Sequence, residues 1–315
     1  MCSRPTSPPP RRARKRAPVP DRRPALLANA RRRVGAASAL SALTLCLATA
    51  ATGQEEASGH FEVLCYNVHG LPPAVTGDDT AARLRAIGPR LEAFDLVALQ
   101  EDFLDDGHHH LVRSRTHRRA VRFSRPLPGR LFGSGLTLLA RFPIRAQAAR
   151  SFSTYHGLLG SGSDGFASKG FLMLRLELAP GVELDVYDTH LDAGGEPGDV
   201  RARAAQVDEL IVAVRRRSCG RALLLLGDTN LKTTRSGDRP PLARLLDGLR
   251  LRCACRAVRA TCCGRIDRIL YRSGAGLELD CAGWGLAREF RDAHGLPLSD
   301  HTPVRATFRW RRGAL

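Results

Sequence analysis

The pattern of apolar and polar positions changes several times along the chain. Residues 223–226 are four leucines in a row, whereas a strand with one wet face would alternate. The run therefore predicts a short strand that is buried on both faces. Residues 171–178 alternate between apolar and polar side chains, which predicts another strand. Residues 198–217 carry apolar side chains at helical spacing, which predicts a helix.

The same patterns predict the order of elements in the rest of the chain. Expected strands cover 61–67, 95–99, 134–144, 171–178, 183–191, 223–226, 266–271 and 277–287, with a last strand that ends at residue 310. Expected helices cover 79–93, 198–217 and 241–249, and Gly88-Pro89 interrupts the first of them. This order predicts a mixed α/β domain with antiparallel strand pairs rather than a regular βαβ repeat.

Polar side chains collect where the apolar strands are expected to end. They are Asn67, Glu101, His190, Asp228, Asn230, Asp267, Asp300 and His301. Taken singly, such an aspartate is usually a cap and such a histidine is usually a surface or core residue. If the strands of a packed sheet end on one side, however, all eight meet at one edge. Two histidines and four acids in one place predict a functional site.

The segment that follows the leucine run, residues 227–230, contains side chains that could bind a cation. Asp228 and Asn230 follow Gly227 with i, i+2 spacing, so their side chains can approach one point. A carboxylate and an amide oxygen suit a hard cation such as Mg²⁺, or the anion that such a cation holds. Gly, Asp and Asn are also ordinary turn residues, so this segment alone leaves a simple turn open.

Charge is distributed unevenly over the 315 residues. The formal net charge is +18, and residues 1–50 contribute +10 of it, which leaves +8 for the remainder. A surface of this charge is compatible with nucleic acid or with phospholipid headgroups, and it does not choose between them.

The N-terminal segment is predicted to be a targeting signal. Residues 1–33 are rich in Pro and Arg and are expected to be disordered, and 34–51 are apolar and uncharged. The small-residue site Ala48-Thr49-Ala50 follows, so 1–51 are interpreted as a basic n-region plus a secretory signal peptide. An uncleaved membrane anchor is the alternative. We expect a secreted, extracellular or periplasmic protein with one folded domain at 58–311.

Seven cysteines remain after the predicted cleavage. Four of them, Cys253, Cys255, Cys262 and Cys263, lie close together. In an exported chain this predicts one or two local disulfides, with a metal cluster as the minor alternative because the spacing does not match the usual zinc patterns. Cys65 lies in an apolar strand and is predicted to be a buried thiol.

Seven short motifs resemble one known family. They are YNVHG at 66–70, QE at 100–101, SGLTLLARFPI at 134–144, THLDAG at 189–194, GDTN at 227–230, RIDRIL at 265–270 and SDHTPV at 299–304. In this order they resemble the endonuclease/exonuclease/phosphatase superfamily, also called the deoxyribonuclease I-like fold. The resemblance implies a four-layer α/β/β/α sandwich of two packed mixed β-sheets with helices on the outer faces. It also implies metal-assisted hydrolysis of a phosphate ester.

The resemblance assigns the metal ligands by position. Glu101 matches the main Mg²⁺ ligand, Asn67 stands beside it, and Asp300 would support the metal or Asp228. Mn²⁺ and Ca²⁺ are alternatives to Mg²⁺ at such a site.

The resemblance also assigns the catalytic roles. His301 matches the general base that takes a proton from the attacking water, and Asp267 would orient it. Asp228 would position the water or a second metal. Asn230 and His190 would bind the phosphoryl oxygens, and His190 could also help the leaving oxygen.

Within the superfamily the chain is more similar to the sphingomyelinase branch, at residues 168–171 and 189–191 and in the helix that contains Gln206. Members of that branch are Mg²⁺-dependent phosphodiesterases of the phospholipase C type. Lys169 is therefore expected to contact a lipid phosphate, with an exposed loop lysine as the alternative. The expected partner is a phospholipid at a membrane surface. DNA or a small-molecule or inositol phosphate is the alternative substrate, and the protein is expected to be a monomer without a stable protein partner.

Two features of the sequence do not fit that branch simply. An exposed aromatic hairpin for membrane insertion is not evident; Trp284 with Phe290, or the segment 156–166, are candidates that also suit a packed strand and a loop. The triple histidine at 108–110 is predicted to form an exposed polar turn, with metal binding as the alternative.

Overall fold

The computed structural model describes residues 57–113, 116–157, 166–259, 264–274 and 276–313. The predicted leader at 1–51 lies outside the described residues. So do Cys262, Cys263 and residues 158–165. The predicted disulfides and the domain boundaries therefore stay predictions.

The first of two sheets contains six strands in the order β11-β12-β1-β2-β4-β3. Its strands are β11 (Leu277–Leu286), β12 (Val304–Arg312), β1 (Ser58–Asn67), β2 (Leu96–Gln100), β4 (Leu136–Ala140) and β3 (Arg119–Phe123). β1 and β2 run parallel, and the other neighbouring pairs are antiparallel. Two of the polar residues expected at strand ends belong to this mixed sheet: Asn67 ends β1, and Glu101 directly follows β2.

The second sheet also contains six strands, in the order β5-β6-β7-β8-β10-β9. Its strands are β5 (Ile144–Ser151), β6 (Gly170–Ala179), β7 (Val182–His190), β8 (Leu223–Asp228), β10 (Asp267–Arg272) and β9 (Arg252–Cys253). β7 and β8 are parallel, and the remaining pairs are antiparallel. The four leucines of β8 are completely buried, as the unbroken apolar run predicts.

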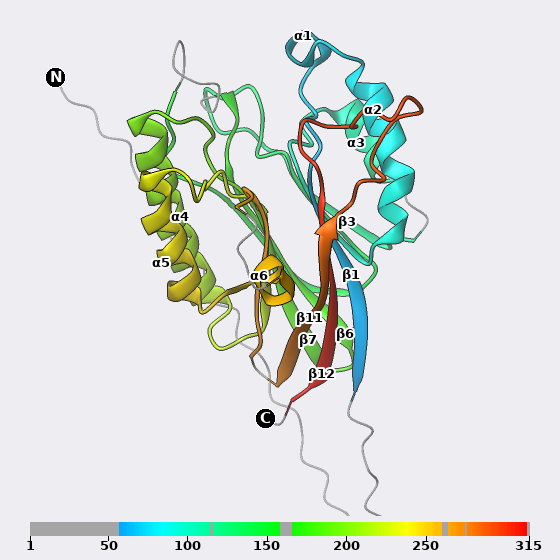
Figure 1. Cartoon of the computed structure of the whole chain (residues 1–315), viewed down its shortest axis with the longest axis vertical. Helices are drawn as coiled ribbons and strands as arrows, with labels where there is room; N and C mark the ends of the chain where they lie inside the picture. Colours follow the sequence, from blue (N-terminus) through cyan, green and yellow to red (C-terminus); the bar gives the residue numbers. More distant parts are fainter. Residues whose placement is uncertain (1–56, 114–115, 158–165, 260–263, 275, 314–315) are drawn as a thin grey trace, which may run out of the picture. The chain divides into compact units, whose positions relative to one another are not determined.

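Helices cover the outer face of each sheet (Figure 1). On the first sheet lie α2 (Thr80–Ile87), the 3₁₀ helix η1 (Gly88–Ala93) and α3 (Asp105–Leu111), preceded by the short α1 (Pro73–Thr76). On the second lie α4 (Pro197–Arg217) and α5 (Arg239–Leu249), with η3 (Ser236–Asp238) before α5. The short α6 (Ala254–Arg259) follows β9 and packs on β11 of the first sheet instead, with Ala254 buried in the cluster between the sheets. Gly88-Pro89 ends the regular α-helix, because proline cannot donate the next backbone hydrogen bond.

Apolar side chains fill three layers between these elements. The largest cluster lies between the two sheets and includes Phe61, Leu174, Leu226 and Phe308. Each fully buried leucine there contributes about 2 kcal/mol by its removal from water. Two further clusters join each sheet to its own helices. The predicted four-layer α/β/β/α sandwich is therefore confirmed.

The triple histidine does not form a polar turn, and that prediction is wrong. Residues 105–111 form helix α3. Its first turn contains Asp105 and Asp106, and the N-terminus of a helix favours negative charge. His108 Nδ1 lies 2.6 Å from Oδ2 of the buried Asp102. The contact joins α3 to the residue that follows Glu101.

Two other sequence predictions concern buried side chains. Cys65 is completely buried, as expected, and burial raises the pKa of its thiol well above the usual value. Phe290 is also buried, with its ring centroid 5.1 Å from that of Tyr66, so it does not form an exposed aromatic tip.

None of the helices within the described ranges is long and apolar enough to cross a membrane.

Candidate active site

The predicted strand-end residues meet at one edge of the two sheets. β1 and β2 are parallel and end in register at Asn67 and Gln100, directly before Glu101. In the second sheet His190 is in register with Asp228, and Asp228 with Asp267. Because the two sheets pack face to face, these ends bring their polar side chains into one cluster.

Asp228 is the centre of this cluster. Its Oδ2 accepts a hydrogen bond of 3.2 Å from Asn67 Nδ2, which comes from the other sheet. The same oxygen lies 3.4 Å from His190 Nε2 and 3.7 Å from His301 Nε2. Burial and the neighbouring charge of Asp267 raise the pKa of Asp228 to about 6.

A second set of contacts orients His301. Its Nδ1 lies 2.8 Å from Asp267 Oδ1, and the other oxygen of Asp267 accepts a hydrogen bond of 3.0 Å from Arg265 Nη2. Burial alone would lower the pKa of His301. The contact with Asp267 outweighs it and raises this pKa to about 9.

His190 lies in the opposite electrostatic environment. Burial and the positive charge of Lys169 lower the pKa of His190 well below its ordinary value. Lys169 Nζ lies 2.7 Å from His190 Nε2 and is itself buried, so the alternative of an exposed loop lysine is wrong. Because an ammonium only donates, Nε2 accepts from Lys169, and the ring proton stays on Nδ1. That Nδ1 is buried and has no hydrogen-bond partner among the described residues.

Glu101 provides an ionised oxygen without a partner. Its Oε1 accepts a hydrogen bond of 2.8 Å from Asn67 Nδ2, while its buried Oε2 has no hydrogen-bond partner in the part of the chain that the structure describes. Burial would raise the pKa of Glu101, but the neighbouring His69 and the positive charge of Lys169 lower it below the usual range. A buried, charged and unsatisfied oxygen of this kind fits a divalent cation.

The two other predicted ligands are placed differently. Asn67 uses its Nδ2 to join Glu101 and Asp228, and its Oδ1 accepts the backbone N–H of His69 at 3.0 Å. An amide oxygen has two lone pairs, so Oδ1 keeps one for a cation. Asp300 lies at the rim of the site with its side chain 58% exposed, and its Oδ1 is 3.5 Å from His69 Nδ1.

A second group of possible ligand atoms includes Asp228 itself. Single atoms of Asp228, Asp267 and His301 lie within 4.8 Å of one another, which is close enough to surround one ion. The predicted alternatives for Asp228, a water-positioning residue or a ligand of a second metal, both fit this geometry.

Asn230 completes the predicted set. It has a left-handed φ of 50°, which asparagine tolerates better than most residues, and its backbone N–H donates to Asp228 Oδ1 at 3.1 Å. Its Nδ2 donates to the carbonyl of Leu191 at 3.0 Å, directly after His190. The structure thus brings Asn230 against the same loop as His190.

Three contributors were missed by the sequence analysis. His69 contacts Glu101 and Asp300, and Arg265 holds Asp267. Both lie inside motifs that were recognised, YNVHG and RIDRIL, but nothing in their spacing marks them. Arg83 donates to the carbonyls of Val68, His69 and Leu298, and helical periodicity gives no sign of that role.

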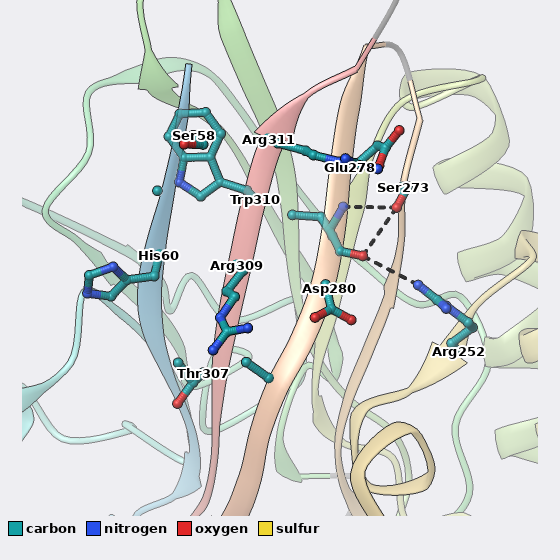
Figure 2. A pocket seen from close by; sticks show the side chains of 13 residues that line it. Ser58, His60, Arg252, Ser273, Glu278, Asp280, Thr307, Arg309, Trp310 and Arg311 are labelled. Atoms are coloured by element: carbon teal, nitrogen blue, oxygen red, sulfur yellow. Dashed lines mark hydrogen bonds and ion pairs between the residues drawn. The ribbon is translucent and has the colours of Figure 1, made fainter. Parts of the chain in front are cut away.

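A large cavity lies at the other end of the strands. Figure 2 shows its lining side chains, which come from the start of β1, the end of β12 and the start of β11 together with Arg252 and Ser273, around a volume of about 1120 Å³. The residues of the cluster come from the end of β1 and the start of β12, about 30 Å away at 3.3 Å per residue. A smaller cavity of about 410 Å³ lies beside His301, with Lys232, Arg265, Asp267 and Asp300 among its walls.

Comparison with known proteins agrees with this geometry. The family model described as "Endonuclease/Exonuclease/phosphatase family" matches residues 64–301, and the chain belongs to this family. A sphingomyelinase of Mycobacterium tuberculosis is 29% identical over 281 residues, which cover 82% of this chain and 54% of that protein. The chain thus spans about half the length of this relative. The predicted superfamily and the similarity to its sphingomyelinase branch are confirmed.

Solved structures share the fold at low sequence identity. A variant of beta toxin from Staphylococcus aureus with bound magnesium ions has a TM-score of 0.57 at 16% identity, covering 79% of this chain and 99% of that chain. TDP2 from Caenorhabditis elegans also has a TM-score of 0.57, at 18% identity, covering 79% of this chain and 75% of that chain.

Proposed function

We propose that the protein is a divalent-cation-dependent phosphodiesterase that releases the headgroup of a sphingomyelin-like phospholipid. One observation carries the proposal. His301, oriented by Asp267, lies 3.7 Å from Asp228, which Asn67 joins to Glu101, and a buried oxygen of Glu101 has no hydrogen-bond partner among the described residues. A base and a cation site connected through one carboxylate suit the attack of water on a phosphate ester.

His301 is the proposed general base. Its Nδ1 is held by Asp267, so Nε2 is the atom that takes the proton from water. With a pKa of about 9 the ring is protonated at neutral pH as long as no cation offsets the negative charge of the surrounding carboxylates. A bound divalent cation supplies positive charge that neutralises the phosphoryl oxygens and favours the neutral ring.

His190 and Lys169 form the proposed binding site for the phosphoryl oxygens. The buried Nδ1–H of His190 is a donor without a partner among the described residues, and a phosphoryl or leaving oxygen would satisfy it. Lys169 adds a positive charge beside the same ring. Fixed donors of this kind stabilise the charge that develops on oxygen in the transition state.

The choice of a lipid substrate rests on the similarity to sphingomyelinases over most of this chain. The proposed cation is Mg²⁺, because Glu101 and Asn67 would bind it through oxygen atoms, which Mg²⁺ prefers as ligands. The predicted signal peptide supports a secreted or periplasmic protein that meets lipid outside the cytoplasm. A deoxyribonuclease with the same chemistry is the alternative that a test must exclude.

The test is product release by residues 51–315 in Mg²⁺. Sphingomyelin vesicles, phosphatidylcholine vesicles and plasmid DNA are offered separately, and His301→Ala serves as the control for contaminating activity. Phosphocholine release with an intact plasmid supports the lipid phosphodiesterase. Nicked plasmid with intact vesicles supports the nuclease and contradicts the proposal, and cleavage of neither points to a smaller phosphate ester.

A further inference from the structure

His69 lies at the point where β1 and β2 end side by side. Its Nδ1 is 3.7 Å from Glu101 Oε2, the oxygen that has no hydrogen-bond partner among the described residues. The side chain is 27% exposed, so the ring is only partly reached by solvent. None of the predicted roles uses this imidazole.

The backbone holds His69 and Glu101 together in an unfavourable conformation. Their φ angles are 50° and 60°, in the left-handed region that costs an ordinary residue about 1–2 kcal/mol. The N–H of Gly70 donates to the Glu101 carbonyl at 3.0 Å, and Arg83 donates to the His69 carbonyl at 2.8 Å. Histidine adopts this region more readily than most residues, so the turn can hold the imidazole beside Glu101.

The distance between the two side chains suits two ligands of one ion. At 3.7 Å the pair is too long for a hydrogen bond. Two ligand atoms that each lie about 2.1 Å from a cation are about 3.0 Å apart at a right angle and about 3.4 Å apart at a tetrahedral angle. The observed separation therefore needs to close by about 0.3 Å for a tetrahedral ion and by about 0.7 Å for an octahedral one.

We propose that His69 Nδ1 is a nitrogen ligand of the cation that Glu101 binds, and that it shifts the preference of the site from Mg²⁺ toward Mn²⁺ and Co²⁺. Imidazole binds transition metals more strongly than Mg²⁺, which prefers oxygen. The proposal rests on the cation site of the proposed phosphodiesterase and adds a determinant of which ion is bound.

Calorimetric titration of residues 51–315 with Mg²⁺ and with Mn²⁺, in the absence of substrate, tests this ligand directly. The variant His69→Asn removes the imidazole but keeps a residue that tolerates left-handed φ. We expect His69→Asn to lose about tenfold or more in Mn²⁺ affinity and to change Mg²⁺ affinity by less than about threefold. The visible absorption of bound Co²⁺ should change in the same variant, because a nitrogen ligand is lost.

Three control variants make the result specific. His60 is an exposed histidine at the start of β1, the end of the strand opposite Asn67, and His60→Asn should bind both ions as the wild type does. Glu101→Gln should lose both ions. His301→Asn tests the other candidate nitrogen, beside Asp228 and Asp267.

An unchanged ratio of Mn²⁺ to Mg²⁺ affinity in His69→Asn contradicts the proposal. A loss of Mn²⁺ preference in His301→Asn but not in His69→Asn contradicts it as well, because the nitrogen ligand would then be His301. If the wild type releases phosphocholine but His69→Asn keeps the wild-type ratio, only this inference fails. If the wild type binds no divalent cation, both the inference and the cation dependence of the proposed function fail.

Discussion

The two oxygens of Asp267 are divided between His301, the proposed general base, and Arg265. Oδ1 lies 2.8 Å from His301 Nδ1, and Oδ2 accepts from Arg265 at 3.0 Å. Arg265 also donates to the Thr302 carbonyl at 2.8 Å, so it connects the aspartate to the loop that carries His301. The orientation of the proposed base is therefore fixed from both sides.

Replacement of His301 should abolish catalysis without unfolding the protein. His301→Ala removes the proton acceptor from a partly exposed loop and leaves the core unchanged. We expect turnover to fall by about 10²–10⁴-fold, the usual range for general acid–base catalysis. Turnover and circular dichroism, measured on the same preparation, check this. A folded His301→Ala protein with wild-type turnover contradicts the assignment.

Arg265 should influence the reaction through Asp267. Arg265→Gln removes the charge that holds Asp267 Oδ2, so we expect kcat to fall about tenfold with little change in KM. Arg265→Lys should recover part of the loss, because an ammonium can still pair with the carboxylate. Arg244, whose ion pair with Asp208 lies at the surface, gives the matched control Arg244→Gln. Equal losses in the two glutamine variants would mean that Arg265 has no specific role.

The stability of the cation-free protein should depend on pH through His301. Its pKa is about 9 in the folded protein and about 6.5 in an unfolded chain, so protonation favours the folded state. This contribution is fully present below about pH 6.5 and is lost as the pH rises toward 9. We expect the difference in Tm between the wild type and His301→Asn, measured in EDTA, to shrink over that interval. A difference that stays constant from pH 6 to pH 10 contradicts the raised pKa.

Removal of divalent cations should stop the reaction, and Mg²⁺ should restore it. A cation that binds only the folded state also raises Tm. At one hundred times its Kd it adds about 2.7 kcal/mol to the free energy of unfolding. Glu101→Gln should lose this shift, because the buried charge that attracts the ion is gone. Glu278→Gln, at an exposed ion pair with Arg311, should keep it. Full activity of the wild type in EDTA would exclude a cation-dependent mechanism.

The layers of the fold and the membership of the site could be predicted from the sequence. Leu223–Leu226 had to be buried on both faces because four apolar residues in a row cannot alternate. Asn67, Asp228 and His301 could be placed together because the strands that carry them end at a common edge. These inferences depend only on periodicity and on the order of the motifs.

Contacts within the site depend on local backbone conformation, which periodicity does not reveal. Glu101 and His69 face each other because both adopt left-handed φ, and no pattern of apolar residues predicts that. Helix α3 was missed because DDGHHHL has no apolar stripe: Leu111 is its one apolar residue and is buried among the helices, and His108 contacts the buried Asp102. Arg265 was passed over because an arginine beside a motif aspartate is usually solvated, whereas here it joins two loops.

Hydrolysis of sphingomyelin vesicles in water enriched with ¹⁸O tests the central claim most directly. If His301 activates water for attack on phosphorus, the released phosphocholine carries one ¹⁸O atom, and His301→Ala releases this product at least about 10²-fold more slowly. Phosphocholine without ¹⁸O, or labelled phosphocholine at wild-type rate from His301→Ala, contradicts the account.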